Sequence, residues 1–124
     1  MATPRKESST NQANQHVLHN ACPVNDTLKR LSPRWKMQVL FCIGQGQNRF
    51  SVLKHLFPSL SDHVLGKRLR ELELEQLVVK QTDTAAVPPQ VRYFATPKGL
   101  DLLQIMAALH RWEQQYPLVE LPTP

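Results

Sequence analysis

The sequence predicts a mainly helical α+β domain, in which several amphipathic helices precede one β-hairpin and a long last helix. Three patterns support this prediction. Apolar residues recur at helical spacing through most of residues 23–77. Two short runs rich in β-branched and aromatic residues follow at 78–82 and 91–95, with a polar segment between them. Helical spacing then returns from Thr96 to about Tyr116, so the last ordered element is expected to be a helix.

The chain has 124 residues, which favours one folded domain. Residues 1–20 are rich in Ser, Thr, Asn and Gln and offer little to bury, so we expect a disordered N-terminal arm. The domain is expected over residues 21–117, with a short tail at 118–124. The spacing of His16, His19 and Cys22 suggests a metal site, but chance explains it better in a polar arm. We therefore expect neither a metal nor a cofactor.

Two helices are expected at the start of the domain. Pro23 suits the first position of a helix over residues 23–31, which carries Val24, Leu28 and Leu31 on one face. Ser32 can cap the second helix, with Pro33 at its first position and Gly44 and Gly46 after its end. This second helix is expected to lie at the centre of the core, because its apolar face is broad and consists of Trp35, Val39, Leu40 and Ile43.

A pair of helices with a tight connection is predicted next. Asn48 is expected to cap the first, whose buried residues would be Phe50, Leu53, Leu56 and Phe57, and Pro58 should end it. The second covers residues 60–77, with Ser61 as its N-cap and Leu65, Leu69 and Leu72 as a stripe facing the core. Two helices joined in this way form a helix-turn-helix, in which the second helix reads DNA.

The outward face of residues 60–77 is basic. At 100° per residue, His63, Lys67 and Arg70 fall together opposite the leucine stripe. The acids Glu71, Glu73 and Glu75 follow towards the C-terminal end. Such a helix can enter a groove of double-stranded DNA with its N-terminus first. The alternative is an ordinary solvated surface.

Charge is unevenly distributed along the chain. There are 15 Lys and Arg residues against 10 Asp and Glu residues, and the pI is about 9.6. Between Lys29 and Arg70 the single acid is Asp62, so one half of the domain is expected to be positive, as suits nucleic acid. No apolar run approaches membrane-spanning length and no hydrophobic signal segment starts the chain, so a cytoplasmic location is expected.

The two β runs read as a hairpin that must pack on the helices, because two strands alone are not stable in water. Its tip contains Pro88 and Pro89 and could reach a minor groove, with Gln90 and Arg92 as candidate contacts. The hairpin makes the predicted fold a winged helix-turn-helix with a two-stranded wing. The last helix, capped by Thr96 and Pro97, has a wider apolar arc than one small core requires. We therefore expect it to be a dimerisation helix.

These residues resemble the HxlR-type winged helix-turn-helix regulators of bacteria, which are relatives of the MarR group. The likeness runs from Cys22 to about Trp112 and includes the segment 22–24, Trp35 with the aliphatics after it, Arg49–Phe50 with Leu53, the segment 65–73, and the segment 88–99. The resemblance implies a homodimeric transcription regulator that binds an inverted repeat. Its subunits would join through the first and last helices, with the interface residues Val24, Leu28, Leu102, Ile105, Met106, Leu109 and Trp112.

Pattern and resemblance together give one set of candidate DNA contacts: Arg49, Ser61, His63, Gly66, Lys67, Arg68, Arg70, Gln90 and Arg92. Two of them depart from the family pattern. Gly66 stands where a hydroxyl residue is common, and glycine weakens a helix by roughly 1 kcal/mol relative to alanine. Arg92 stands where glutamate is common, so this wing is more basic.

The two cysteines differ in their expected roles. Cys22 precedes Pro23, where unpaired N–H groups of a helix start favour a thiolate, and certain relatives sense oxidants or electrophiles with a cysteine there. A structural role is the open alternative. Cys42 is expected to be a buried, inert thiol.

Two rival classes of function stand beside DNA binding. No phosphate loop, metal cluster or catalytic set is recognisable, so an enzyme is not expected. A winged helix that makes only protein contacts is the alternative to a DNA-binding regulator.

Overall fold

The computed structural model describes residues 22–119. The chain forms two compact units, Met1–Arg34 and Trp35–Pro124. The described part of the first unit contains a helix over residues 22–31. It includes Cys22, so the prediction that Pro23 begins this helix is wrong. His16, His19 and the predicted N-terminal arm lie outside the described residues.

The helix at 22–31 ends in local hydrogen bonds. The Ser32 backbone N–H donates to the Leu28 carbonyl at 2.8 Å, and Ser32 Oγ donates to the Lys29 carbonyl at 3.3 Å. Ser32 therefore ends the first helix instead of capping the second. Val24 and Leu28, which share a face, are both exposed.

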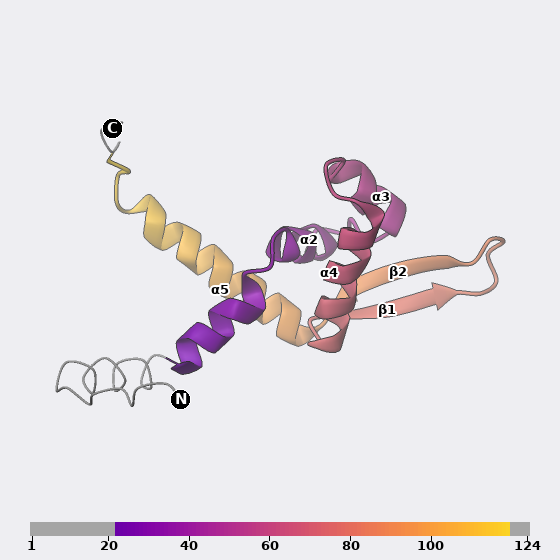
Figure 1. Cartoon of the computed structure of the whole chain (residues 1–124), viewed down its shortest axis with the longest axis horizontal. Coiled ribbons are helices and arrows are strands. Elements are labelled where there is room, and N and C mark those ends of the chain that lie inside the picture. The colour runs from indigo at the N-terminus through magenta and orange to yellow at the C-terminus, as the bar shows by residue number, and fades with distance from the viewer. Residues whose placement is uncertain (1–21, 120–124) are drawn as a thin grey trace, which may run out of the picture. The chain divides into compact units, whose positions relative to one another are not determined.

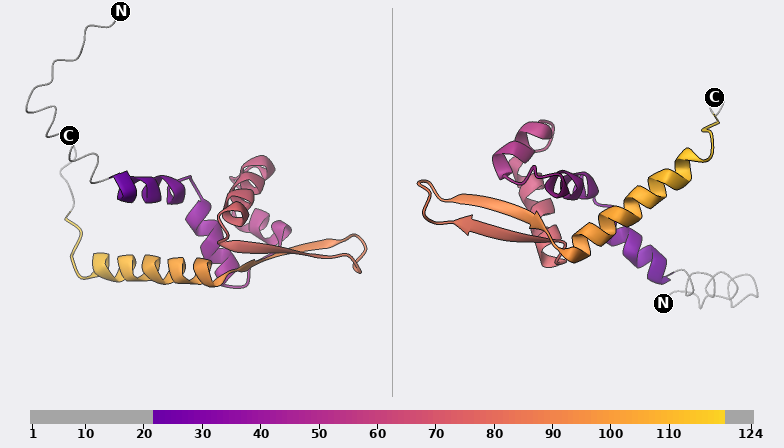
Figure 2. Two further views of the ribbon diagram at one scale, coloured as in Figure 1. Left: turned by 90° about the horizontal axis from the view of Figure 1, so that it is seen from below. Right: turned by 180° about the vertical axis from the view of Figure 1, so that it is seen from behind.

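The second unit contains α2 (Lys36–Gly44), α3 (Phe50–Leu56), α4 (Asp62–Leu74), β1 (Val78–Asp83), β2 (Gln90–Ala95) and α5 (Pro97–Gln114). The predicted α+β, mainly helical fold class is confirmed. The antiparallel hairpin extends beyond α2, α3 and α4, and α5 leaves from the base of the hairpin (Figures 1 and 2).

α2 begins later than predicted. Its N-cap is Trp35, which has a left-handed φ of 74° and provides no side-chain cap. Trp35 is half-buried and packs on Phe57, with ring centroids 5.8 Å apart. The prediction that Ser32 and Pro33 begin this helix is therefore wrong. Its core face is as predicted, because Val39, Leu40 and Ile43 are buried.

The backbone before α3 is hydrogen-bonded to strand β2. The Tyr93 N–H donates to the Asn48 carbonyl at 2.9 Å, and Arg49 forms a β-bridge with Arg92. Arg49 is the N-cap of α3 and makes no side-chain cap, so the prediction that Asn48 caps the helix is wrong. Leu56, predicted to be buried, is 45% exposed. Leu53 is the α3 residue that fills the core.

The hydrophobic core joins α2, α3 and α4 to the base of the hairpin. Leu65, Leu69 and Leu72 of α4 are buried as predicted, together with Val39, Leu40, Ile43, Leu53, Leu60, Leu77, Val78 and Tyr93. The strands pair from Val78 with Ala95 to Asp83 with Gln90. The predicted hairpin is therefore confirmed, with each strand one residue longer than expected.

α4 ends in a turn, which is stabilised by hydrogen bonds from residues at the start of α5. Gln76 has a φ of 59°, and the N–H groups of Gln76 and Leu77 donate to the carbonyls of Glu73 and Leu72. This is a Schellman motif. Three further carbonyls receive donors from the start of α5: Glu75 from Lys98 Nζ at 2.7 Å, Gln76 from Thr96 Oγ1 at 2.6 Å and Leu77 from the Thr96 N–H at 3.0 Å.

Gly99 explains how closely α4 and α5 approach. A Cβ at this position would lie 2.2 Å from the Leu77 carbonyl oxygen, so no larger residue fits without movement of the backbone. Thr96 also caps α5 as predicted, because its Oγ1 accepts from the Gly99 N–H at 3.0 Å. The end of α4 and the start of α5 therefore form one connected joint.

Candidate nucleic-acid interface

The outer face of α4 carries basic side chains over a buried leucine stripe. Ser61 caps the helix as predicted, because its Oγ accepts from the Val64 N–H at 3.1 Å. His63, Lys67 and Arg70 are exposed opposite the stripe. Within residues 22–119 none of these three side chains forms an ion pair. They are therefore available to a partner outside the chain.

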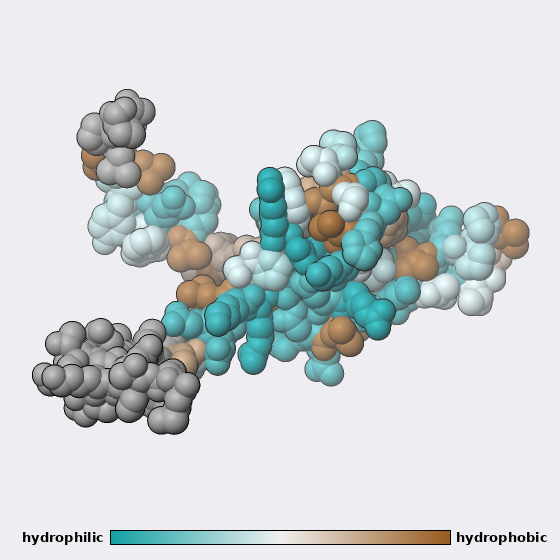
Figure 3. Space-filling view, viewed as in Figure 1, coloured by the Kyte–Doolittle hydropathy of each residue, from teal (hydrophilic) through white to brown (hydrophobic). Residues whose placement is uncertain are grey.

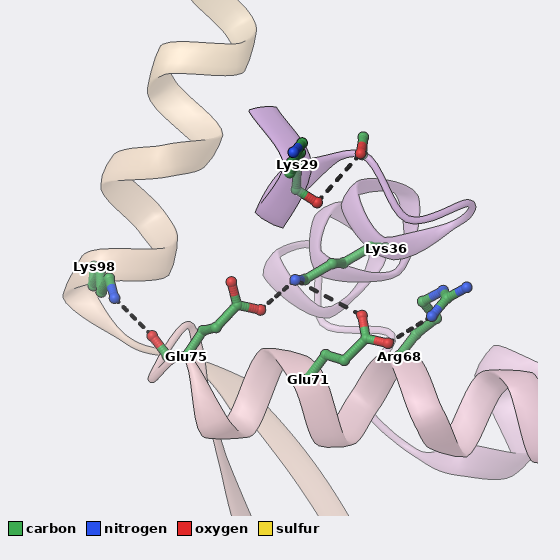
Figure 4. A network of polar contacts seen from close by, with 7 residues as sticks. Lys29, Lys36, Arg68, Glu71, Glu75 and Lys98 are labelled. Carbon is green, nitrogen blue, oxygen red and sulfur yellow. Dashed lines mark hydrogen bonds and ion pairs between the residues drawn. The ribbon is translucent and has the colours of Figure 1, made fainter. Parts of the chain in front are cut away.

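The flank of α4 that faces α2 is different. Lys36 of α2 has a side chain that is only 3% exposed, and it pairs with Glu75 and, at 3.8 Å, with Glu71 (Figure 4). Arg68 Nη1 donates to Glu71 Oε1 at 2.6 Å. We call Lys36, Arg68, Glu71 and Glu75 the α2–α4 ion network. Two cations balance two carboxylates in it, so it adds little net charge to the surface.

This network reduces the number of basic side chains that the predicted positive half exposes. Lys36 is buried, and Arg68, a candidate DNA contact, is 15% exposed and lies against Glu71. Lys54 of α3 is also engaged, because its Nζ donates to the Leu60 carbonyl and lies 3.3 Å from Asp62 Oδ1. Several basic residues counted in the sequence therefore hold helices together.

A second basic region lies along the hairpin. Gln90 and Arg92 are exposed on β2, and the Arg49 bridge places the backbone of that arginine next to Arg92. Within the described part of the chain neither arginine has an acidic partner. Sequence reasoning proposed both residues separately, but no sequence signal indicated that they are neighbours.

A cleft of about 690 Å³ separates α4 from the hairpin. It is lined by Gly66, Arg70, Glu73, Leu74, Gln76, Lys80 and Tyr93. Lys80 pairs across the hairpin with Tyr93, so both side chains lie on the same side of the sheet. Burial raises the pKa of Tyr93, and the nearby Glu73 carboxylate raises it further. Lys80 was absent from the predicted site, although the period of two in β1 places it on the side of the buried Val78.

An apolar groove of about 710 Å³ lies between α2 and α5. Its lining includes Met37, Phe41, Cys42, Leu103 and Met106. Burial raises the pKa of Cys42, which keeps this thiol protonated and unreactive near neutral pH. Cys42 is half-buried, less deeply buried than predicted.

α5 exposes several large apolar side chains. Ile105, Leu109 and Trp112 are each about 60% exposed, whereas Leu102 and Met106 are half-buried. Hydrophobic side chains are visible among hydrophilic ones along this helix (Figure 3). Cys22 of the first unit is also exposed.

Residues 22–119 contain no cluster of three or more His, Cys, Asp or Glu side chains that could hold a metal ion. Over the same range, no helix combines the length and the apolar character needed to cross a membrane.

Helix, turn, helix with an exposed basic face and an attached hairpin define a winged helix-turn-helix of the DNA-binding kind. The comparisons with known proteins agree. Residues 30–120 match the family model described as HxlR-like helix-turn-helix. The chain belongs to this family, which is one of transcriptional regulators and not of enzymes.

Relatives of known sequence and structure support the same class. The chain is 37% identical to YvaP of Bacillus subtilis, an uncharacterized HTH-type transcriptional regulator, over 69% of this chain and 79% of the relative. The solved structure of the redox regulator HypR in its oxidized form has a TM-score of 0.67 and 31% identity, covering 79% of this chain and all of HypR. Reduced YodB from B. subtilis, a transcriptional regulator, has a TM-score of 0.65 and 26% identity, covering 74% of this chain and 89% of YodB.

Proposed function

We propose that the protein binds a specific operator in double-stranded DNA as a homodimer, with α4 in the major groove. The observation that carries this proposal is the exposed set of His63, Lys67 and Arg70 opposite a fully buried leucine stripe. Because that stripe fixes the rotation of α4, the basic face is held outward before DNA arrives. Lysine and arginine pair with guanine in the major groove, so Lys67 and Arg70 are the proposed base contacts.

The other predicted contacts divide by position. Ser61 and His63 lie at the N-terminal end of α4, which enters the groove first. Arg49, Gln90 and Arg92 lie on or beside the hairpin and would contact the DNA backbone or the adjacent minor groove. Arg68 is held by Glu71, so we assign it to orienting α4 and not to reading bases.

The homodimer is proposed to form through α5, with help from the helix at 22–31. Its proposed interface residues are Val24, Leu28, Leu102, Ile105, Met106, Leu109 and Trp112, of which five are more than half exposed. The hydrogen bonds between the end of α4 and the start of α5 would fix each recognition helix relative to the dimer axis. Half-sites roughly 34–36 Å apart are then expected.

DNA binding is tested by selecting bound fragments from random DNA and measuring their affinity for variants. Lys67→Ala and Arg70→Ala should each lose discrimination worth about 1–3 kcal/mol. The matched control is Arg111→Ala, an exposed arginine on α5. Affinity should fall steeply with salt through counterion release, whereas a protein-contact module would respond little. Wild-type affinity in both α4 variants would contradict the proposal.

The homodimer is tested by sedimentation of the whole chain from micromolar concentration upward. The monomer mass at every concentration would contradict the dimer. Leu109→Glu, which places a charge on the exposed apolar face of α5, should shift the equilibrium towards monomer. Arg111→Glu serves as the control, because it changes charge on the same helix at a residue outside the proposed interface.

A response to oxidants through Cys22 is the finer part of the proposal. It is supported by the exposure of Cys22 and by the likeness to HypR, which is described as a redox regulator. Wild type, Cys22→Ser and Cys42→Ser are treated with peroxide or a quinone, and operator binding is followed. Loss of the response in Cys22→Ser alone is expected. If Cys22→Ser responds as the wild type does, Cys22 is not the sensor.

A further inference from the structure

Gly66 lies within α4, and nothing inside the described protein requires a glycine there. A Cβ built on Gly66 would meet no atom within 4 Å, whereas one on Gly99 would collide with backbone. Glycine weakens a helix relative to alanine because the unfolded chain has more freedom to lose. The recognition helix therefore bears this cost without any gain in packing.

The open space beside Gly66 belongs to the cleft between α4 and the hairpin. Gly66 and Arg70 are four residues apart, so they lie on adjacent turns of one helix face, and both line the cleft. Lys80 reaches the same cleft from β1, and Tyr93 lies opposite it in the sheet. Two cations and a residue without a side chain thus border one opening. The Glu73 carboxylate, also in the lining, lies two turns of helix from Gly66.

DNA geometry identifies what would occupy this cleft. In a duplex, one sugar–phosphate strand separates a major groove from the neighbouring minor groove. A helix in the first and a wing in the second must straddle that strand, and the straddled space lies between α4 and the hairpin. The ammonium of Lys80 suits a phosphate, because ion pairing to phosphate dominates the affinity of proteins for DNA, and Arg70, the proposed base contact, borders the same cleft.

We propose that this cleft seats the sugar–phosphate strand between the two grooves, with Gly66 as its point of close approach and Lys80 as a phosphate contact. The inference rests on the proposed DNA binding; it gives a specific role to Gly66, already a candidate contact, and adds Lys80 as a new one. Gly66 sets how deeply α4 enters the groove. Lys80 adds affinity that does not depend on the sequence of the DNA.

The test compares folding and binding in Gly66→Ala and Gly66→Leu. Both residues favour helix and nothing in the protein obstructs the Cβ, so the melting temperature should rise by about 4 °C. Affinity for the selected operator should fall about tenfold or more for alanine and further for leucine, because the added atoms occupy the space of the strand. A variant that is more stable but binds more weakly cannot be explained by misfolding.

Lys80→Ala provides an independent measurement. Its affinity should fall by a similar factor on operator and on unrelated DNA, and the slope of log affinity against log salt should decrease by about one. Arg111→Ala is the control, because it removes one positive charge from an exposed residue of α5 outside the cleft.

The possible failures are distinguishable. If the wild type binds a selected operator and both Gly66 variants bind equally well, close approach at Gly66 is overturned while the proposed function stands. An unchanged salt slope in Lys80→Ala would remove the phosphate contact in the same way. If the wild type selects no DNA at all, the proposed function and this inference fall together.

Discussion

The two flanks of α4 use charged residues in opposite ways. On the α2 side, Arg68, Glu71 and Glu75 surround the buried ammonium of Lys36. On the outer and hairpin side, Lys67 and Arg70 are exposed and form no ion pair within residues 22–119. The same residue types thus hold the helix on one flank and remain available on the other. What separates the two roles is burial and the presence of a partner, not the sign of the charge.

The α2 side of α4, its closed flank, buries charged groups at a cost in free energy and is therefore sensitive to disruption. Removing an ammonium from water costs several kcal/mol, which nearby carboxylates recover only if the geometry is good. Glu75 contacts the lysine directly, whereas Glu71 stands 3.8 Å from it and accepts from Arg68 instead. Glu71 Oε2 is buried and has no hydrogen-bond partner within the described residues. The stability of the α2–α4 ion network therefore depends on the balance between its positive and negative charges.

The largest expected effect comes from breaking this balance. Lys36→Met keeps the apolar stem but leaves Glu75 without its cation and Glu71 with Arg68 alone. Because Glu71 and Glu75 are each about one quarter exposed, water relieves part of the penalty, and a loss of about 2–3 kcal/mol in the free energy of unfolding is expected. Urea denaturation measures it. Lys67→Met on the open flank is the matched control and should stay within about 0.5 kcal/mol of wild type.

A double variant shows whether the loss comes from charge or from packing. Lys36→Met combined with Glu75→Gln should lose less stability than the sum of the single changes, because the second change removes a charge that the first left unpaired. Simple additivity would mean that the ammonium of Lys36 and the carboxylate of Glu75 do not stabilise each other.

An intermediate effect is expected from two arginines of the same helix. Arg68→Ala should cost about 1 kcal/mol of stability through the lost pair with Glu71 and leave base preference unchanged. Arg70→Ala should leave stability unchanged and lose base preference. Unfolding and operator selectivity, measured on both variants, test whether Arg68 stabilises the fold while Arg70 reads bases. If Arg68→Ala changes which base is preferred, Arg68 reads DNA and its pair with Glu71 must open on binding.

Local patterns predicted the elements whose causes lie within the element. The stripe of Leu65, Leu69 and Leu72, the caps at Ser61 and Thr96, and the hairpin all follow from spacing and residue type, and all are confirmed. The starts of α2 and α3 were missed, because each depends on a contact made elsewhere. Trp35 packs on Phe57, and Asn48 bonds to β2 through its backbone.

The candidate site shows the same distinction between features set by a local pattern and features set by distant contacts. Helical periodicity placed His63, Lys67 and Arg70 outward, but it could not show that Lys36 is buried. Its partner Glu75 is 39 residues away, and a lysine in the first turn of a helix is ordinarily solvated. Lys80 was missed because it lies on a strand whose neighbouring helix is known only from the fold. Pairings that are distant in sequence leave no local signal.

The smallest effect is expected at the end of α4, where the open and closed flanks meet. Gln76 occupies the left-handed position of the Schellman motif with a φ of 59°, which glycine adopts without strain. Gln76→Gly should therefore raise the free energy of unfolding by about 0.5–1 kcal/mol. Gln76→Ala is the control, because it removes the same side chain and keeps the strain, so it should bring no gain. The hydrogen bond that the Gln76 carbonyl accepts from Thr96 belongs to the backbone and survives in both variants. A denaturation midpoint for Gln76→Gly no higher than that for Gln76→Ala would mean that the left-handed angle at residue 76 carries no strain that glycine relieves.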